Sequence, residues 1–372
     1  MSLFLAAYLT IYGGIHLYLW FRTVRAFDLH PPWSPLLGVL CAFMVAAPII
    51  VRLLQRHDAE GAARAVAYVG YTWMGCIFLF FSASVAIDLL RGVLWTGAKL
   101  LGREIFQIPS AAALSVSLVL AVAAATYGFF DARKLRVEHV TVKTQKLPKR
   151  VRVVQLSDVH LGLVVGRERL LQILQEVIAA QPDLLVCTGD LIDGQVDGLQ
   201  GLDEVLQQVK PPLGKFAVTG NHEAIAGIAP SVGFIRRSGF TLLRGDAAHM
   251  AGALTVTGVD DPFIHSSSPI SEPALLKALP REKFILLLKH RPAVHPDSRG
   301  LFDLQLSGHV HKGQIFPFNL LTHLFYPAPM GLSSAGPGSH LYVSRGTGTW
   351  GPPMRVLAPP EITIVDIVPQ EG

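Results

Sequence analysis

Four long apolar runs dominate the first third of the chain, at residues 3–21, 35–54, 66–90 and 111–130. Each reaches about the 20 residues that an α-helix needs to cross a bilayer, and each carries few charges. Helices of a soluble bundle would show a polar face, which these runs lack. The pattern therefore predicts four transmembrane helices, and the second has the weakest signal because Pro48 interrupts it.

The pattern changes after residue 131. Residues 132–150 are rich in Lys and Arg and contain the alternating segment RVEHVTVKTQ, which predicts a basic linker and an edge strand. From residue 151 onward, short apolar runs alternate with helical patterns such as RERLLQILQEVIAA. Strands alternating with helices predict a layered α/β domain over residues 151–372, following a transmembrane domain over residues 1–131.

Composition agrees with a membrane protein. Hydrophobic residues make up 51% of the chain and charged residues only 16%, against about 25% in typical soluble proteins. The three cysteines lack metal-ligand spacing and predict no disulfide framework. The net charge of +5 comes with no basic run interleaved with aromatics after residue 151, so we do not expect a nucleic-acid partner.

The distribution of basic residues predicts an orientation. With four spans both termini face one side, and cytoplasmic flanks carry the excess of Lys and Arg. That side would hold more of them than the opposite side: Arg52, Arg56, Arg64, Arg133, Lys134, Arg136, Lys143, Lys146, Lys149 and Arg150, against Arg22, Arg25, Arg91, Lys99 and Arg103. We therefore expect a multi-pass protein, of a bacterial inner membrane, with residues 151–372 in the cytoplasm.

Polar residues follow five of the predicted strands, where ligand sites in α/β sheets gather. The strands are VRVVQL, DLLVC, KFAVT, FILLL and FDLQL, and the residues that follow them are Asp158, His160, Asp190, Asn221, His222, His290, His309 and His311. Each fragment alone is a weak signal. Together they offer oxygen and nitrogen ligands for divalent metals, with no thiolate among them.

The ordered set Asp-x-His, Gly-Asp, Gly-Asn-His-Glu, His and Gly-His-x-His resembles that of the calcineurin-like metallophosphoesterases. The resemblance covers residues 137–368, and the tail YVSRGTGTWGPPMRVLAPPEITIVDI is similar to the membrane-associated bacterial branch of that family. It implies a two-sheet β sandwich flanked by helices, an αββα fold, that carries a dinuclear metal centre.

The resemblance also implies a role for each residue. One metal would be held by Asp158, His160, Asp190 and His311, and the other by Asp190, Asn221, His290 and His309. Asp190 would bridge the two metals. We prefer His290 to His295 because it directly follows the apolar strand. The resemblance assigns protonation of the leaving group to His222, which Asp158 could orient.

The expected function is that of a metal-dependent phosphoric ester hydrolase. Hydroxide held by two Mn, Fe or Zn ions would attack a phosphodiester or pyrophosphate bond, since two cations stabilise both the attacking and the leaving oxygens. The membrane anchor favours a lipid-linked substrate, and members that resemble this branch act on UDP-linked acylated glucosamine. The alternatives are a phosphodiesterase for a soluble cyclic nucleotide and a non-catalytic membrane sensor or accessory protein with a metal-binding domain.

Two features near the last histidines leave alternatives open. The branch commonly reads Gly-His-x-His-Gly-Gly-Gln, and Lys312 replaces the first following glycine. A positive φ there would cost a lysine roughly 1–2 kcal/mol. Lys312 is either a tolerated surface change or a positive charge that binds a phosphate or an anionic headgroup. The apolar stretch at residues 315–333 is either a loop packed over the sandwich or a hydrophobic lip that dips into the bilayer.

Overall fold

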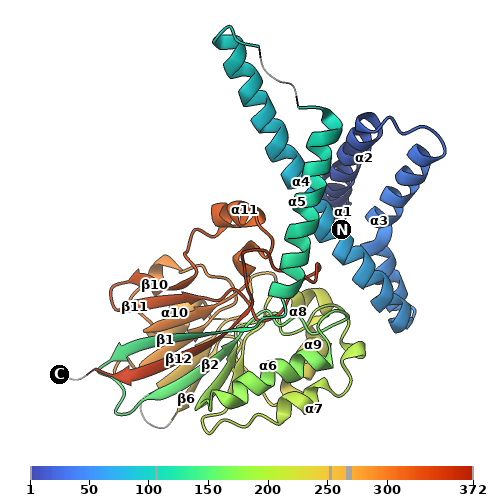
Figure 1. Ribbon diagram of the computed structural model, residues 1–372. Helices are drawn as coiled ribbons and strands as arrows, with labels where there is room; N and C mark the ends of the chain where they lie inside the picture. Colours follow the sequence, from blue (N-terminus) through green and yellow to red (C-terminus); the bar gives the residue numbers. More distant parts are fainter. Residues whose placement is uncertain (1, 105–107, 251–253, 265–269, 371–372) are drawn as a thin grey trace. The chain divides into compact units, whose positions relative to one another are not determined.

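The computed structural model describes residues 2–104, 108–250, 254–264 and 270–370 of the chain (Figure 1). The chain divides into two compact units. The first comprises residues 1–130 and 351–356, and the second comprises residues 131–350 and 357–372.

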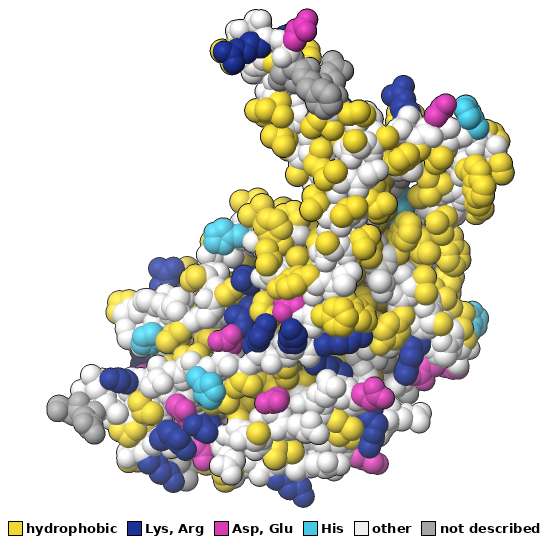
Figure 2. Space-filling model, viewed as in Figure 1, with side chains coloured by type: hydrophobic (Ala, Val, Ile, Leu, Met, Phe, Trp, Pro, Cys, Tyr) yellow, Lys and Arg dark blue, Asp and Glu magenta, His cyan; other side chains and the backbone are white. Residues whose placement is uncertain are grey.

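The first unit is helical. Its N-terminal part runs without a break from an α-helix through a π-helical segment into a second α-helix, and three longer helices follow. The elements are α1 (Ser2–Tyr8), the π-helix Leu9–Gly13, α2 (Gly14–Ala26), α3 (Trp33–Arg56), α4 (Glu60–Leu100) and α5 (Ser110–Asp131). Hydrophobic side chains cover much of the visible surface of these helices (Figure 2).

Among the described residues, three helices are long and apolar enough to cross a membrane, namely α3, α4 and α5. The first of the four predicted spans is not among these three, because the π-helix separates α1 from α2 and each of the two α-helices is too short alone. The second run, which Pro48 made the weakest, forms a continuous helix. The third extends well beyond residues 66–90, because α4 has 41 residues.

A short segment from late in the sequence belongs to the helical unit. Residues 351–356 pack there, and the backbone N–H of Arg355 donates to the carbonyl of Gly128 in α5 over 2.9 Å. The side chain of Met354 lies close to Gly75 in α4. The sequence pattern alone places this segment in the domain over residues 151–372.

The second unit contains two six-stranded sheets that lie face to face (Figure 1). The first has the order β1-β12-β2-β3-β4-β5 and the second has the order β10-β11-β9-β8-β7-β6. The strands of the first sheet are β1 (Arg136–Thr144), β2 (Val151–Leu156), β3 (Leu184–Cys187), β4 (Lys215–Ala217), β5 (Thr241–Leu242) and β12 (Glu361–Pro369). Those of the second are β6 (Asp246–Met250), β7 (Leu254–Gly258), β8 (Phe284–Leu288), β9 (Leu304–Ser307), β10 (Gly331–Gly336) and β11 (Ser339–Val343).

The central strands are apolar on both faces, which explains their continuous hydrophobic runs. In β3, Leu184 and Val186 join the core between the two sheets, and Leu185 and Cys187 join the core under the helices. The side chains alternate because successive residues of a strand point to opposite faces. β2, β3 and β4 are parallel neighbours, and so are β8 and β9, so their carboxyl ends lie along one edge of each sheet.

Helices cover the outer faces of the sandwich, as the αββα prediction required. α6 (Arg167–Ala179), α7 (Leu202–Gln207) and α9 (Ile228–Arg237) contribute to the core on the first sheet, and α10 (Glu272–Lys277) contributes to the core on the second. Two further short helices, α8 (Asn221–Ala226) and α11 (Phe318–Phe325), follow β4 and β9. The coarse prediction of a two-sheet sandwich flanked by helices is thus confirmed.

Candidate metal centre

The loops after β2, β3, β4, β8 and β9 bring all seven predicted ligand side chains together. Five of these side chains are buried, while Asn221 and His309 are partly buried. Cross-connections fix the loops on one another. The imidazole Nδ1 of His290, after β8, contacts the carbonyl of Thr188, after β3, over 2.9 Å. The backbone N–H of His309, after β9, donates to both carboxylate oxygens of Asp158, after β2.

One cluster consists of Asp158, His160 and His311. Their ligand atoms all lie within 4.8 Å of one another. Nε2 of His311 lies 3.2 Å from Oδ1 of Asp158 and 3.1 Å from Nε2 of His160. Nδ1 of His160 is buried and has no hydrogen-bond partner among the described residues. Two imidazole nitrogens and a carboxylate oxygen that converge in a buried space are a donor set that suits a divalent cation.

A second cluster consists of Asp190, His290 and His309. Nε2 of His290 lies 3.1 Å from Oδ2 of Asp190 and 3.1 Å from Nδ1 of His309. The amide oxygen of Asn221 lies 3.2 Å from the same Nε2 of His290. Since Nδ1 of His290 is engaged by the carbonyl of Thr188, its Nε2 is left for the cluster, as in many metal-binding histidines.

Asp190 lies between the two clusters. Its Oδ2 is 3.1 Å from Nε2 of His290 in one cluster and 4.0 Å from Nε2 of His160 in the other. Its Oδ1 accepts the backbone N–H of His222 over 2.8 Å. One carboxylate that faces both clusters is the arrangement that a bridging ligand requires.

The backbone around the clusters is strained. Five of the seven predicted ligands have a positive φ, namely Asp158, His160, Asp190, His309 and His311. Left-handed backbone is uncommon for residues other than glycine, and it gathers where surrounding structure enforces it for function. Lys312 also has a positive φ, of 51°, so this position does impose the cost that the missing glycine would avoid.

His222 lies beside the clusters and pairs with Asp193. Its Nδ1 is 3.0 Å from Oδ1 of Asp193, and its ring meets that of His160 edge-on with centroids 4.6 Å apart. The suggestion that Asp158 orients His222 is therefore wrong, because Asp193 makes that contact. Asp193 was not among the predicted residues, although its place three positions after Asp190 in the segment GDLIDG was a usable signal.

Glu223 is a second residue that sequence reasoning left without a role. Its fully buried carboxylate accepts the backbone N–H groups of Asp190, Leu191, Ile192 and Gly220 over 2.7–3.2 Å. It thereby fixes the loop after β3 to the loop after β4. Glu223 is the last residue of the motif Gly-Asn-His-Glu, but the motif does not indicate which groups its carboxylate binds.

Burial and neighbouring charges separate the histidines by protonation state. Burial and the positive charge of the neighbouring His222 lower the pKa of His160 to about 3. Burial and the positive charge of His290 likewise lower the pKa of His309 to about 4. Burial opposes the charge on His222, but the hydrogen bond to Asp193 and the charges of Asp190 and Asp193 raise its pKa to about 9. His160 and His309 are thus neutral, as ligands must be, while His222 carries a proton that it can donate.

The pKa of His290 is also raised, to about 10, because the charge of Asp190 outweighs the effect of burial. A proton and a metal ion are attracted by the same carboxylate. A cation held by Asp190 would therefore compete with the proton on His290, as expected when metal binding releases protons. The donor types and their burial both fit a pair of divalent cations.

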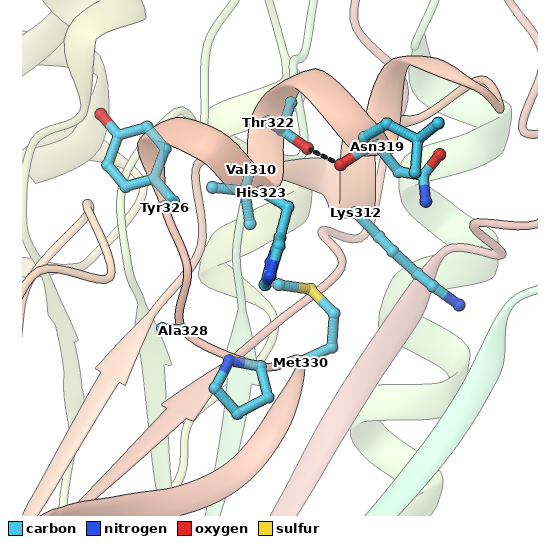
Figure 3. Close-up of a pocket in the computed structure, with 10 residues that line it drawn as sticks. Val310, Lys312, Asn319, Thr322, His323, Tyr326, Ala328 and Met330 are labelled. Carbon is cyan, nitrogen blue, oxygen red and sulfur yellow. Dashed lines mark hydrogen bonds between the residues drawn. The ribbon is translucent and has the colours of Figure 1, made fainter.

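A cavity of about 320 Å³ adjoins the metal centre. Val310 and Lys312, on either side of His311, line it together with Tyr326, whose ring meets that of His309 edge-on. Figure 3 shows the cavity bounded above by α11, from which His323 extends toward Met330. Lys312 is exposed on the rim of this cavity rather than among the clusters.

Comparisons with known proteins agree with this geometry. A family model described as calcineurin-like phosphoesterase matches residues 151–313, which hold all seven predicted ligands. An uncharacterized metallophosphoesterase from Aquifex aeolicus is 38% identical over 256 residues, covering 67% of this chain and 98% of the relative. This chain belongs to the calcineurin-like metallophosphoesterase family. The resemblance drawn from the motif order is confirmed.

Two further relatives extend the match. An uncharacterized metallophosphoesterase from Campylobacter jejuni is 29% identical over 378 residues, which cover 96% of each chain and so include the helical unit. A protein from Danio rerio, described as a transmembrane protein with metallophosphoesterase domain, is 33% identical over 268 residues, covering 67% of this chain and 61% of the relative.

Proposed function

We propose that this metallophosphoesterase is a membrane-anchored enzyme that hydrolyses a phosphodiester or pyrophosphate bond in a lipid-linked substrate, with two divalent cations as cofactor. The cations would be held by Asp158, His160, Asp190 and His311 on one side, and by Asp190, Asn221, His290 and His309 on the other. Mn, Fe and Zn all suit these oxygen and nitrogen ligands.

The His222–Asp193 pair is the observation that carries the catalytic part of this proposal. A module that only binds metal needs ligands, but it has no use for a protonated imidazole held beside them by a carboxylate. Nδ1 of His222 is engaged by Asp193 over 3.0 Å, so its Nε2 is the atom that can give a proton to a leaving oxygen. The raised pKa of about 9 keeps that proton in place at neutral pH.

The remaining roles follow from position. When bound, the two cations would supply positive charge to the phosphoryl oxygens and lower the pKa of water. Asp193 orients His222, and Glu223 holds the two loops that carry Asp190 and Asn221. Lys312, which lines the adjoining cavity, would attract a second phosphate or an anionic headgroup.

Three helices with the length and composition of membrane spans support a substrate drawn from the bilayer. The helical stretch from Ser2 to Ala26, continuous through its π-helix, is a candidate for a fourth crossing. With four crossings, the excess of Lys and Arg supports a bacterial inner-membrane protein whose second unit faces the cytoplasm. Labelling single cysteines at the α2–α3 and α4–α5 connections from either side of sealed vesicles would test this orientation.

The deciding experiment is a hydrolysis screen of the purified full chain in detergent, with Mn²⁺, Fe²⁺ and Zn²⁺ in separate reactions. We expect turnover of bis-p-nitrophenyl phosphate and faster turnover of a lipid-linked phosphodiester or pyrophosphate than of cyclic nucleotides. Asp190→Ala should abolish turnover of all of them, and His222→Ala should abolish it for esters with a poor leaving group.

The screen also separates the alternatives. Preferential hydrolysis of a cyclic nucleotide would replace the lipid-linked substrate with a soluble one. Metal binding without hydrolysis of any phosphoester, under every metal, would favour a sensor or accessory protein and contradict the enzyme proposal.

A further inference from the structure

Helix α11 turns its polar side toward the domain and its apolar side outward. At about 100° per residue, Phe318, Leu320, Leu321, Leu324 and Phe325 share an arc of about 160°, and Asn319, Thr322 and His323 occupy the opposite side. These three polar residues line the cavity beside the metal centre (Figure 3), together with Leu320 at the edge of the apolar arc. A surface helix of a soluble protein normally has the reverse orientation, with its apolar stripe on the core.

The outward side chains are exposed to an unusual degree for their size. Leu324 is 76% exposed, Phe325 is 73% exposed and Leu320 is 63% exposed. Phe316 before the helix and Leu332 after it are exposed as well. Figure 2 shows hydrophobic side chains gathered over this helix. Soluble monomers rarely expose a contiguous apolar patch of this kind unless it is an interaction surface.

The charge of the chain segment that carries the patch favours an anionic partner. The sequence has no Asp or Glu from residue 304 through residue 360, whereas Lys312 is exposed on the rim of the cavity under the helix. The same chain carries three helices that are apolar and long enough to span a bilayer. A tethered domain meets a membrane surface at a high effective concentration, so weak local contacts suffice for docking.

We infer that α11 is an interfacial anchor, whose apolar side enters the bilayer that the chain itself spans, with anionic lipid headgroups around Lys312. An interfacial helix of this type enters the headgroup and acyl boundary by about 5–10 Å. Tyr326, directly after α11, packs edge-on against His309, so docking of the helix would bring the mouth of the cavity to the lipid surface. This inference does not depend on which bond the enzyme cleaves.

The test measures contact between α11 and lipid in the full-length protein. Leu324→Cys, in a chain with Cys41→Ser and Cys76→Ser, would carry a nitrobenzoxadiazole label and be reconstituted into vesicles of phosphatidylcholine and phosphatidylglycerol. Cys187 stays in place because it is buried. A matched chain carries the label at Ile178→Cys on α6, a site that is 56% exposed.

Lipids with a doxyl group at acyl carbon 5 should quench label 324 at least about twice as strongly as label 178 for an insertion of about 5–10 Å. Adding Leu324→Asp and Phe325→Asp to a chain labelled at Leu321→Cys should lower quenching to the level of label 178. Equal quenching at positions 324 and 178 would overturn the inference. A blue-shifted label at 324 that lipid does not quench would overturn it too, since protein would then cover the helix.

Discussion

Gly308, in the loop after β9, lies directly beside the carboxylate of Asp158. A methyl group at this position would meet Ser157 Oγ and Asp158 Oδ2 closer than 3.0 Å, a separation that side-chain carbons essentially never show, and Ser157 Cβ at 3.0 Å. Gly308 does not have a left-handed φ, so alanine can adopt its backbone. The effect of Gly308→Ala is therefore the effect of added volume.

The magnitude follows from the contacts of Asp158. Ordinary contacts begin at 3.4 Å, so relieving the overlap in Gly308→Ala would move the carboxylate by more than the tolerance of about 0.5 Å for a functional constellation. The hydrogen bond from Ser157 Oγ, at 2.5 Å, would be strained by the same push. We expect a loss of about 10–100-fold in metal affinity, or about 1.4–2.7 kcal/mol, and about 10²-fold in turnover.

The assay combines titration of the metal-free protein with Mn²⁺ and hydrolysis of bis-p-nitrophenyl phosphate in detergent. Gly233→Ala is the matched control, because its methyl group would meet only the flexible end of Arg237, at 3.3 Å. Its place inside α9 predicts a gain in stability of about 0.5–1 kcal/mol with unchanged activity. If Gly308→Ala kept the Mn²⁺ affinity and turnover of the unaltered protein, the assignment of Asp158 as a ligand would be refuted.

Three further substitutions give independent checks. Asp193→Asn should lower turnover of alkyl phosphodiesters by about 10²-fold or more, while p-nitrophenyl esters, which need no acid, change little; equal losses on both would contradict the role of His222 as acid. Lys312→Gly should raise the free energy of unfolding by about 0.5–1 kcal/mol in thermal melts, because it relieves the positive φ, and an unchanged KM for every anionic substrate would exclude a role in binding. Burial lowers the pKa of Lys215 from 10.5 to about 8, so its charge opposes folding below pH 8 and the protein should gain stability as pH rises from 8 to 10.5. Lys215→Met should abolish that gain in a pH series of thermal melts, and an unchanged gain would mean that another group titrates.

The strands and the candidate ligands could be predicted because both leave local signals. A strand buried on two faces is a short, continuous apolar run, and the polar residue that follows it is conspicuous. Asp158 after β2 and Asp190 after β3 were found in this way. The same signal favoured His290 over His295, since only His290 directly follows the apolar strand, and in the structure His290 is buried in the second cluster while His295 is exposed.

Other features had no such signal. Asp193 does not directly follow a strand, and its role depends on a contact with His222, 29 positions away. The ends of α4 lie beyond the apolar run because charged residues such as Arg64 and Lys99 continue the helix without being apolar. The apolar stretch at residues 315–333 predicts only a loop or a lip because it lacks strong periodicity, and only the structure shows that it contains α11 and which side of this helix faces the domain.

Counting metal ions in the purified, active protein tests the dinuclear centre most directly. Elemental analysis should find two transition-metal ions per chain, and Asp190→Asn, which alters the carboxylate between the clusters, should lose most of both together with activity. Removal of metal by a chelator should abolish hydrolysis, and Mn²⁺ should restore it. A preparation that hydrolyses phosphodiesters at full rate with fewer than one transition ion per chain would contradict the proposed centre.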